Sequence, residues 1–315
     1  MSLVDVHAHF VTESYVDAAR SAGHDHPDGM PGWPDWSPEA HLALMDSCGI
    51  AASVLSVSSP GVHFGDDAAA RNLAREVNEY GAALRAGRPD RFGHFASLPL
   101  PDVDGALAEA AHALGELGSD GVTVETNAGG RYLGHPDHEP LWSELDRRGA
   151  AVFVHPTSPP GAEALTSGRP RPMLEFVFDT TRAFTDLALS GTLTRFPRIR
   201  WIATHGGGAL PLLADRVELF RTAFGDGSGT PVPEQLAGLW FDTAGTPFPH
   251  QVPTLQRTLG VDRLLYGSDF CWTPEPAVRA QVASVDAAPP PGDGRTWREL
   301  TTDNARRLLT RTGGH

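Results

Sequence analysis

The segment SLVDVHAHF, residues 2–10, joins a short apolar run to two histidines at its end. In an extended strand, side chains two positions apart point to the same face, so His7 and His9 are directed toward one point. Two imidazoles in this arrangement suit the binding of one metal ion. The chain contains 14 histidines, so one such pair also arises by chance, and the two histidines could simply cap a strand. Their interpretation therefore depends on partners from elsewhere in the chain.

Short apolar runs alternate with amphipathic stretches along most of the chain, a pattern typical of βα units around a parallel sheet. Strands are expected at residues 3–9, 51–57, 91–98, 121–125, 151–155, 199–205, 239–243 and 263–268. Helices are expected at residues 66–85, 103–117, 141–148, 173–190, 210–224, 252–259 and 296–309. Eight strands separated by helices predict a (β/α)8 TIM-like barrel. An open doubly wound sheet is the alternative, but no Gly-x-Gly-x-x-Gly motif follows the first strand.

The barrel is expected to be a single domain of residues 1–315. Residues 11–36 are rich in Gly, Pro, His, Asp and Trp and have little periodicity. We interpret this segment as a lid-like insertion over the barrel mouth. Two histidines outside the strand ends have structural interpretations: His94 is expected to pack within the barrel wall, and His138 to lie on the surface.

Composition limits the function. The net charge of −14 argues against nucleic acid or an anionic membrane as a partner. No apolar stretch has membrane-spanning length, and two cysteines are too few for a disulfide framework, so a cytoplasmic protein is expected. All 25 basic residues are arginine. The absence of lysine excludes a lysine Schiff base, a Gly-Lys-Ser phosphate loop and a carbamylated lysine that bridges two metals.

Polar residues follow four of the predicted strands, where the chemistry of a parallel barrel collects. The first strand ends in His7 and His9, and His155 ends the strand at residues 151–155. His205 is followed by three glycines, and Asp269 follows the last strand. A single histidine at a strand end is usually structural. Four histidines and an aspartate at the ends of four strands together predict a metal site.

The segments DVHAHF (residues 5–10), VHPT (154–157), THGGG (204–208) and YGSD (266–269) resemble the amidohydrolase superfamily. Within it, the chain resembles the metal-dependent decarboxylases, which include aminocarboxymuconate semialdehyde, γ-resorcylate and 6-methylsalicylate decarboxylases. Residues 91–101 and 129–134 are most similar to the 6-methylsalicylate group. The resemblance implies one divalent metal ion, usually zinc and sometimes manganese, and a homodimer. It assigns the ion to His7, His9, His155 and Asp269.

The same resemblance implies that His205 is a general acid/base. It favours decarboxylation of a small aromatic or related unsaturated carboxylic acid, with Asp269 or His205 protonating the carbon that loses the carboxylate. The residues themselves are equally consistent with a hydrolase that directs a metal-bound water at a lactone, ester or amide. A barrel that has lost catalysis would lack a ligand or His205, and all five residues are present. His63, Asn127 and Trp272 follow strands and are candidates for binding the substrate.

Overall fold

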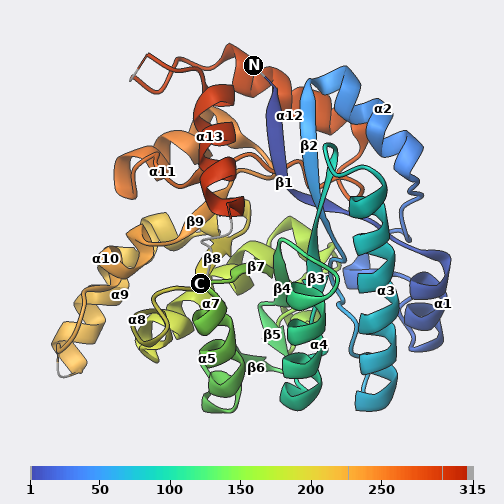
Figure 1. Cartoon of the computed structure of the whole chain (residues 1–315). Coiled ribbons are helices and arrows are strands. Elements are labelled where there is room, and N and C mark those ends of the chain that lie inside the picture. The colour runs from blue at the N-terminus through green and yellow to red at the C-terminus, as the bar shows by residue number, and fades with distance from the viewer. Residues whose placement is uncertain (1, 226, 293, 311–315) are drawn as a thin grey trace.

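The strands of the computed structural model, which describes residues 2–225, 227–292 and 294–310, form one eight-stranded parallel sheet in the order β1-β2-β3-β4-β7-β8-β9-β10. Bridges from Asp5 to Tyr266 and from Ala8 to Phe270 join the first strand to the last, so the sheet closes into a barrel. Helices surround the barrel, as Figure 1 shows. The (β/α)8 prediction is confirmed.

The barrel strands are β1 (Leu3–His9), β2 (Ile50–Ser56), β3 (Phe92–Ser97), β4 (Gly121–Glu125), β7 (Ala151–His155), β8 (Arg200–Ala203), β9 (Trp240–Asp242) and β10 (Leu264–Leu265). A separate antiparallel hairpin consists of β5 (Asn127–Ala128) and β6 (Arg131–Tyr132). The helices are α1 (Glu13–Ser21), α2 (Pro38–Cys48), α3 (Asp67–Gly87), α4 (Val103–Gly115), α5 (Glu139–Arg148), α6 (Ala162–Leu165), α7 (Glu175–Leu189), α8 (Thr192–Arg195), α9 (Leu210–Phe224), α10 (Val232–Ala237), α11 (Val252–Thr258), α12 (Glu275–Ala287) and α13 (Trp297–Leu309). Within the residues that the structure describes, no helix is both long enough and apolar enough to cross a membrane.

The insertion at residues 11–36 is more regular than its composition predicted. It contains α1, whose first turn is capped by Thr12, and a short 3-10 turn at Pro27–Gly29. The Thr12 hydroxyl accepts a hydrogen bond from the Tyr15 amide at 3.1 Å, which satisfies one of the free N–H groups at the helix start. Asp28, in the 3-10 turn, accepts hydrogen bonds from the hydroxyls of Ser59 and Ser158, which follow β2 and β7. The insertion is thereby attached to two loops of the barrel mouth.

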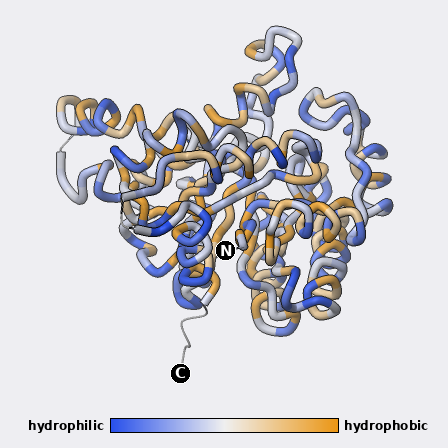
Figure 2. Tube along the Cα trace, turned by 90° about the horizontal axis from the view of Figure 1, so that it is seen from above, coloured by the Kyte–Doolittle hydropathy of each residue, from blue (hydrophilic) through white to orange (hydrophobic). Residues whose placement is uncertain are grey.

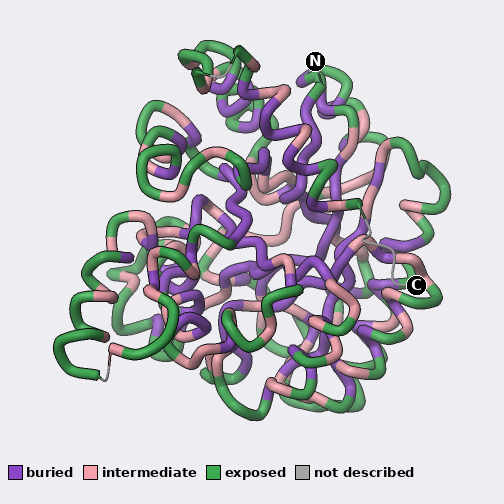
Figure 3. Tube along the Cα trace, turned by 60° about the vertical axis from the view of Figure 1, so that its left-hand side comes forward, coloured by how far each residue is buried: buried purple, intermediate pink, exposed green. Residues whose placement is uncertain are grey.

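Apolar side chains fill the barrel interior. They alternate along the strands and form one cluster: Val4, Val6, Val54, Phe95, Ala151, Phe153, Ile202, Trp240 and Leu265. Ala305 and Leu308 of α13 complete this cluster, and Thr302 donates a hydrogen bond to the Ser2 carbonyl at the start of β1. The α13 helix therefore covers the amino-terminal end of the barrel. Figure 3 shows the central strands as buried, and Figure 2 shows polar and apolar residues alternating along the outer helices.

A β-bulge in β1 directs its two histidines inward. Asp5 pairs with Ser53 and Ala8 with Leu55, so three steps along β1 face two along β2. Val4 and Val6 line the barrel interior, and the extra residue between Asp5 and Ala8 turns His7 and His9 to the same side. The Asp5 carboxylate accepts a hydrogen bond from the His7 amide at 3.1 Å and so satisfies a backbone group at the bulge.

Candidate metal centre and active site

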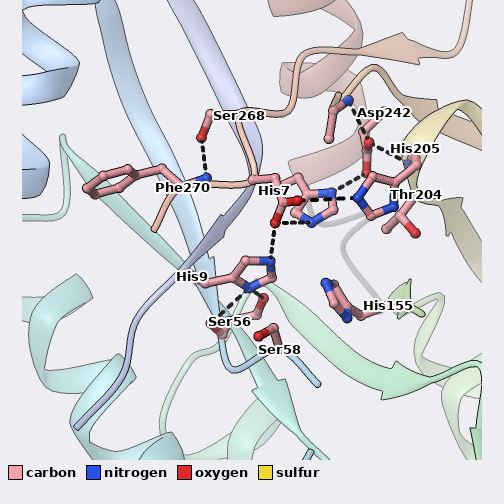
Figure 4. Close-up of polar contacts among 12 residues, drawn as sticks. His7, His9, Ser56, Ser58, His155, Thr204, His205, Asp242, Ser268 and Phe270 are labelled. Carbon is pink, nitrogen blue, oxygen red and sulfur yellow. Dashed lines mark hydrogen bonds and ion pairs between the residues drawn. The ribbon is translucent and has the colours of Figure 1, made fainter. Parts of the chain in front are cut away.

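Three imidazoles and one carboxylate meet at the carboxyl end of the barrel (Figure 4). His7 and His9 come from β1, His155 ends β7, and Asp269 follows β10. One nitrogen or oxygen atom from each lies within 4.8 Å of the others. The ring centroids of His9 and His155 are 4.8 Å apart, and those of His7 and His9 are 4.9 Å apart. The structure thus brings together the four residues that the sequence assigned to a metal ion.

The Nδ1 atoms of His7 and His9 each face an acceptor, and their Nε2 atoms are left for a ligand. The acceptors are Asp242 Oδ2 for His7 at 2.9 Å and Ser56 Oγ for His9 at 3.1 Å. The Nδ1 atom of His155 is buried without a hydrogen bond among the described residues and lies 3.6 Å from Glu125 Oε2. The Nε2 atoms of His7 and His9 are buried without a hydrogen bond among the described residues. Both approach the same atom, Asp269 Oδ1, at 3.4 and 3.2 Å. Buried polar atoms normally have partners, so this donor set fits one divalent cation.

The electrostatics of the cluster lead to the same conclusion. Burial alone would lower the pKa of His7, but the carboxylates of Asp242 and Asp269 raise it to about 10. Burial would raise the pKa of Asp269, yet His7 and the hydrogen bond from His205 hold it well below its usual range. Burial lowers the pKa of His155 well below its usual value. The two carboxylates therefore attract positive charge to the centre, and a divalent ion would supply it.

His205 lies beside the cluster rather than within it. Its Nε2 is 3.4 Å from Asp269 Oδ2, on the opposite carboxylate oxygen from the one that faces His7 and His9. The predicted strand at 199–205 is too long, because β8 ends at Ala203 and His205 begins a 3-10 turn with a φ of 52°. This turn directs the imidazole across the barrel mouth, and the side chain is 14% exposed. A group in this position can exchange protons with Asp269 and with a molecule bound in the cavity that His205 lines.

A cavity of about 260 Å³ opens over His155, His205 and Asp269. Trp272 lines it, as do Pro27, Asp28 and Met30 of the insertion, so residues 11–36 contribute a wall above the metal centre. Phe176 and Val177 of α7 add apolar surface. The Trp272 ring also packs against Trp33 of the insertion, with centroids 5.6 Å apart.

The other two candidate substrate residues line a different cavity. His63 and Asn127 border a neighbouring space of about 380 Å³ together with Glu125. His63 Nε2 is 2.8 Å from Asp67 Oδ1, and Asn127 donates a hydrogen bond to the buried Asp179 at 2.9 Å. These contacts hold both side chains away from the metal centre. Trp272 is therefore the predicted substrate residue that the geometry places at the site.

Sequence reasoning missed Asp242, which is fully buried at the end of β9 and contacts His7. The strand-end rule that identified His155 and His205 applies equally to Asp242, because the strand at 239–243 was predicted. The surface prediction for His138 is wrong, since this side chain is fully buried next to Trp142. His94 is buried as expected, and its Nδ1 is 3.0 Å from the Ser119 hydroxyl.

The chain belongs to the amidohydrolase family, whose model matches residues 4–311. It is 35% identical to the 6-methylsalicylic acid decarboxylase acuB of Aspergillus aculeatus, over 98% of this chain and 96% of that protein. A crystal structure of an amidohydrolase II matches with a TM-score of 0.90 and 35% identity, covering 98% of this chain and all of that one. A manganese-bound 5-carboxyvanillate decarboxylase from Novosphingobium aromaticivorans shares the fold, with a TM-score of 0.86, 21% identity and coverage of 98% and 96%.

Proposed function

We propose that this protein is a metal-dependent decarboxylase of a small aromatic acid of the 2-hydroxybenzoate type. The observation that carries the proposal is the geometry of Asp269. One of its oxygens faces the imidazoles of His7 and His9, and the other faces His205 at 3.4 Å. The same carboxylate can hold a metal ion and exchange a proton, the two tasks that loss of CO2 from an aromatic ring requires. The similarity to a 6-methylsalicylic acid decarboxylase over nearly the full length of both chains supports this assignment.

We assign the ion to His7, His9, His155 and Asp269, and propose zinc or manganese. When bound, a divalent ion orients the substrate carboxylate with its neighbouring hydroxyl and stabilises developing negative charge, worth several kcal/mol of barrier. The pair of Asp269 and His205 delivers a proton to the ring carbon that carries the carboxylate. The bond from that carbon to the carboxylate then breaks, and its electrons restore the aromatic ring as CO2 leaves. His205, which is partly exposed, returns a proton from solvent to the pair.

The cavity indicates a compact substrate. Its volume of about 260 Å³ lies below the range of roughly 300–1,000 Å³ for drug-sized ligands, and suits one ring with small substituents. Met30, Phe176 and Val177 surround this space with apolar groups. They exclude water from the reacting carbon and accommodate an apolar ring substituent such as a methyl group.

The test is to incubate the metal-loaded protein with 2-hydroxybenzoates, including 6-methylsalicylate, and in parallel with simple lactones and esters. Release of CO2 and appearance of the corresponding phenol are expected with at least one of the acids. A matched acid without the 2-hydroxyl group should react more slowly, because it cannot chelate the ion. Turnover of a lactone together with no CO2 from any acid would replace the decarboxylase proposal with a hydrolase.

We also propose that the protein forms a homodimer. Helix α9 exposes several large apolar side chains, which is unusual for a surface that faces only water. They are Leu212, Leu219, Phe220 and Phe224. Figure 1 shows α9 and α10 projecting from one side of the barrel, where a second copy can cover them. Light scattering coupled to gel filtration tests the mass, and Leu219→Glu with Phe224→Glu should produce monomers if α9 lies in the interface.

A further inference from the structure

Asp242 occupies a central place beside the metal centre, although its residue type and position drew no functional assignment from the sequence. Its side chain is completely buried at the carboxyl end of β9. Oδ2 lies 2.9 Å from His7 Nδ1. Oδ1 accepts hydrogen bonds from the backbone amides of His205 at 2.9 Å and Ala244 at 3.0 Å. One carboxylate therefore contacts both a candidate metal ligand and the backbone of the candidate acid/base (Figure 4).

The two oxygens of Asp242 have separable tasks. Oδ1 holds the backbone at His205, whose φ of 52° is uncommon for a residue with a side chain, and at Ala244. Oδ2 faces the His7 ring. An ionised carboxylate only accepts hydrogen bonds, so a bond between Oδ2 and Nδ1 requires the proton of the neutral imidazole to reside on Nδ1. In this neutral tautomer, the form that binds a metal ion, the Nε2 lone pair is free on the side of the ring that faces Asp269.

We propose that Asp242 is a positioning residue that fixes His7 in the tautomer able to bind the metal ion, and that holds His205 at its distance from that ligand. The inference rests on the proposed metal-dependent function but not on the substrate. A partner of this kind commonly orients ligating histidines, and its loss typically weakens metal affinity or activity by 10–100-fold. Asp242 adds a second contact, because the same side chain also holds the His205 backbone.

Asp242→Asn separates the two tasks. Two backbone N–H groups favour the orientation in which the amide oxygen of Asn replaces Oδ1, since the reverse orientation would place donors against donors. The Asn amide then presents N–H to His7 Nδ1, which must become an acceptor. The His7 proton moves to Nε2 and blocks the atom that faces the centre. The loop contacts survive, so a purely structural role for Asp242 predicts little change in metal binding.

Asp5→Asn is the matched control. Asp5 is 1% exposed, lies on the same strand as His7, and accepts hydrogen bonds through Oδ1 from the amides of His7 at 3.1 Å and Ser268 at 3.0 Å. It contacts the backbone of His7, whereas Asp242 contacts the ring. The same chemical change at Asp5 therefore removes a buried carboxylate oxygen without reversing the hydrogen bond to an imidazole.

The experiment measures the affinity of each purified protein for Zn²⁺ by competition with a chromogenic chelator, together with the visible spectrum of the Co²⁺-substituted forms. Asp242→Asn is expected to bind Zn²⁺ about 10–100-fold more weakly than wild type and to change the Co²⁺ ligand-field bands. Asp5→Asn should retain wild-type affinity and bands. Equal affinity and identical bands for wild type and Asp242→Asn would overturn the inference alone. Failure of wild type itself to bind one Zn²⁺ would overturn the metal-dependent function as well.

A measurement on the unaltered protein keeps the proposal testable if Asp242→Asn does not fold. In the Zn²⁺-loaded wild type labelled with ¹⁵N-histidine, the assigned His7 ring should show a protonated Nδ1 and a metal-bound Nε2. Its Nδ1 proton should resonate far downfield because it is donated to a carboxylate. Protonation of His7 at Nε2, or metal bound through Nδ1, would contradict the role of Asp242.

Discussion

Gly208 closes the turn after His205, and replacing it with alanine tests how tightly this turn packs against α7. Its backbone has φ 62° and ψ −122°, a conformation that residues with a side chain rarely adopt. A Cβ atom there would overlap the carbonyl oxygen of Val177 and lie 2.7 Å from Thr181 Oγ1. The Val177 side chain lines the cavity. Gly208→Ala therefore has to displace either the turn that carries His205 or the helix that covers the site.

The expected loss of stability has two parts. Backbone strain at this φ costs about 1–3 kcal/mol. Forcing an extra carbon into a filled space costs about 1–3 kcal/mol more, so the sum is roughly 2–6 kcal/mol. Gly129→Ala is the matched control, because Gly129 also has a positive φ, 57°, but no atom lies within 4 Å of a Cβ built there among the described residues. Gly129→Ala should lose only the stability that the backbone strain costs, about 1–3 kcal/mol.

Urea unfolding of the two variants and wild type, at equal concentration of divalent ion, gives the two free-energy changes. Gly208→Ala should be destabilised by more than Gly129→Ala, and its kcat/KM should fall because His205 or Val177 has moved. Equal losses of stability in the two variants would refute the reasoning, since they would show that the space beside Gly208 accommodates a methyl group without displacement.

Three further predictions concern the metal centre and its proton donor. His155→Ala removes one of four ligands and should lose the ion during gel filtration, as measured by elemental analysis; full metal content would exclude His155 as a major ligand. His205→Ala should keep the ion and slow turnover by roughly 10²–10⁴-fold, and a turnover close to wild type would remove His205 from the mechanism. Treatment with a chelator should lower the thermal midpoint, because an ion at about 100 times its Kd stabilises the folded state by about 2.7 kcal/mol; a midpoint unaffected by chelation and re-addition would argue against a bound ion.

The sequence predicted the barrel well where strands are buried on both faces. β1, β4 and β7 occur at their predicted bounds, because buried parallel strands are continuous apolar runs flanked by polar residues. The last strand is shorter than the predicted 263–268, since β10 contains only Leu264–Leu265 and the ladder continues as single bridges. Helix α12 and the hairpin of β5 and β6 were not predicted.

The candidate site was predictable to the extent that it follows from strand ends. His7, His9, His155, His205 and Asp269 each end or follow a strand, and the barrel topology alone brings them together. Side-chain partners distant in sequence gave no such signal. The contact of Asn127 with Asp179 depends on how α7 packs over the barrel, which residue order does not show.

The candidate metal ligands lie on both sides of the seam where the first and last strands close the barrel. Among the residues that the structure describes, isolated bridges join β1 to the segment that follows β10, supported by hydrogen bonds such as that from the Asp269 amide to the His7 carbonyl at 2.8 Å. His7 and His9 lie on one side of this seam and Asp269 on the other. An ion held by all three would be a removable cross-link between the two ends of the fold, comparable in effect to a disulfide that closes a long loop. Metal supply would then affect how stable the closed barrel is as well as whether it can react.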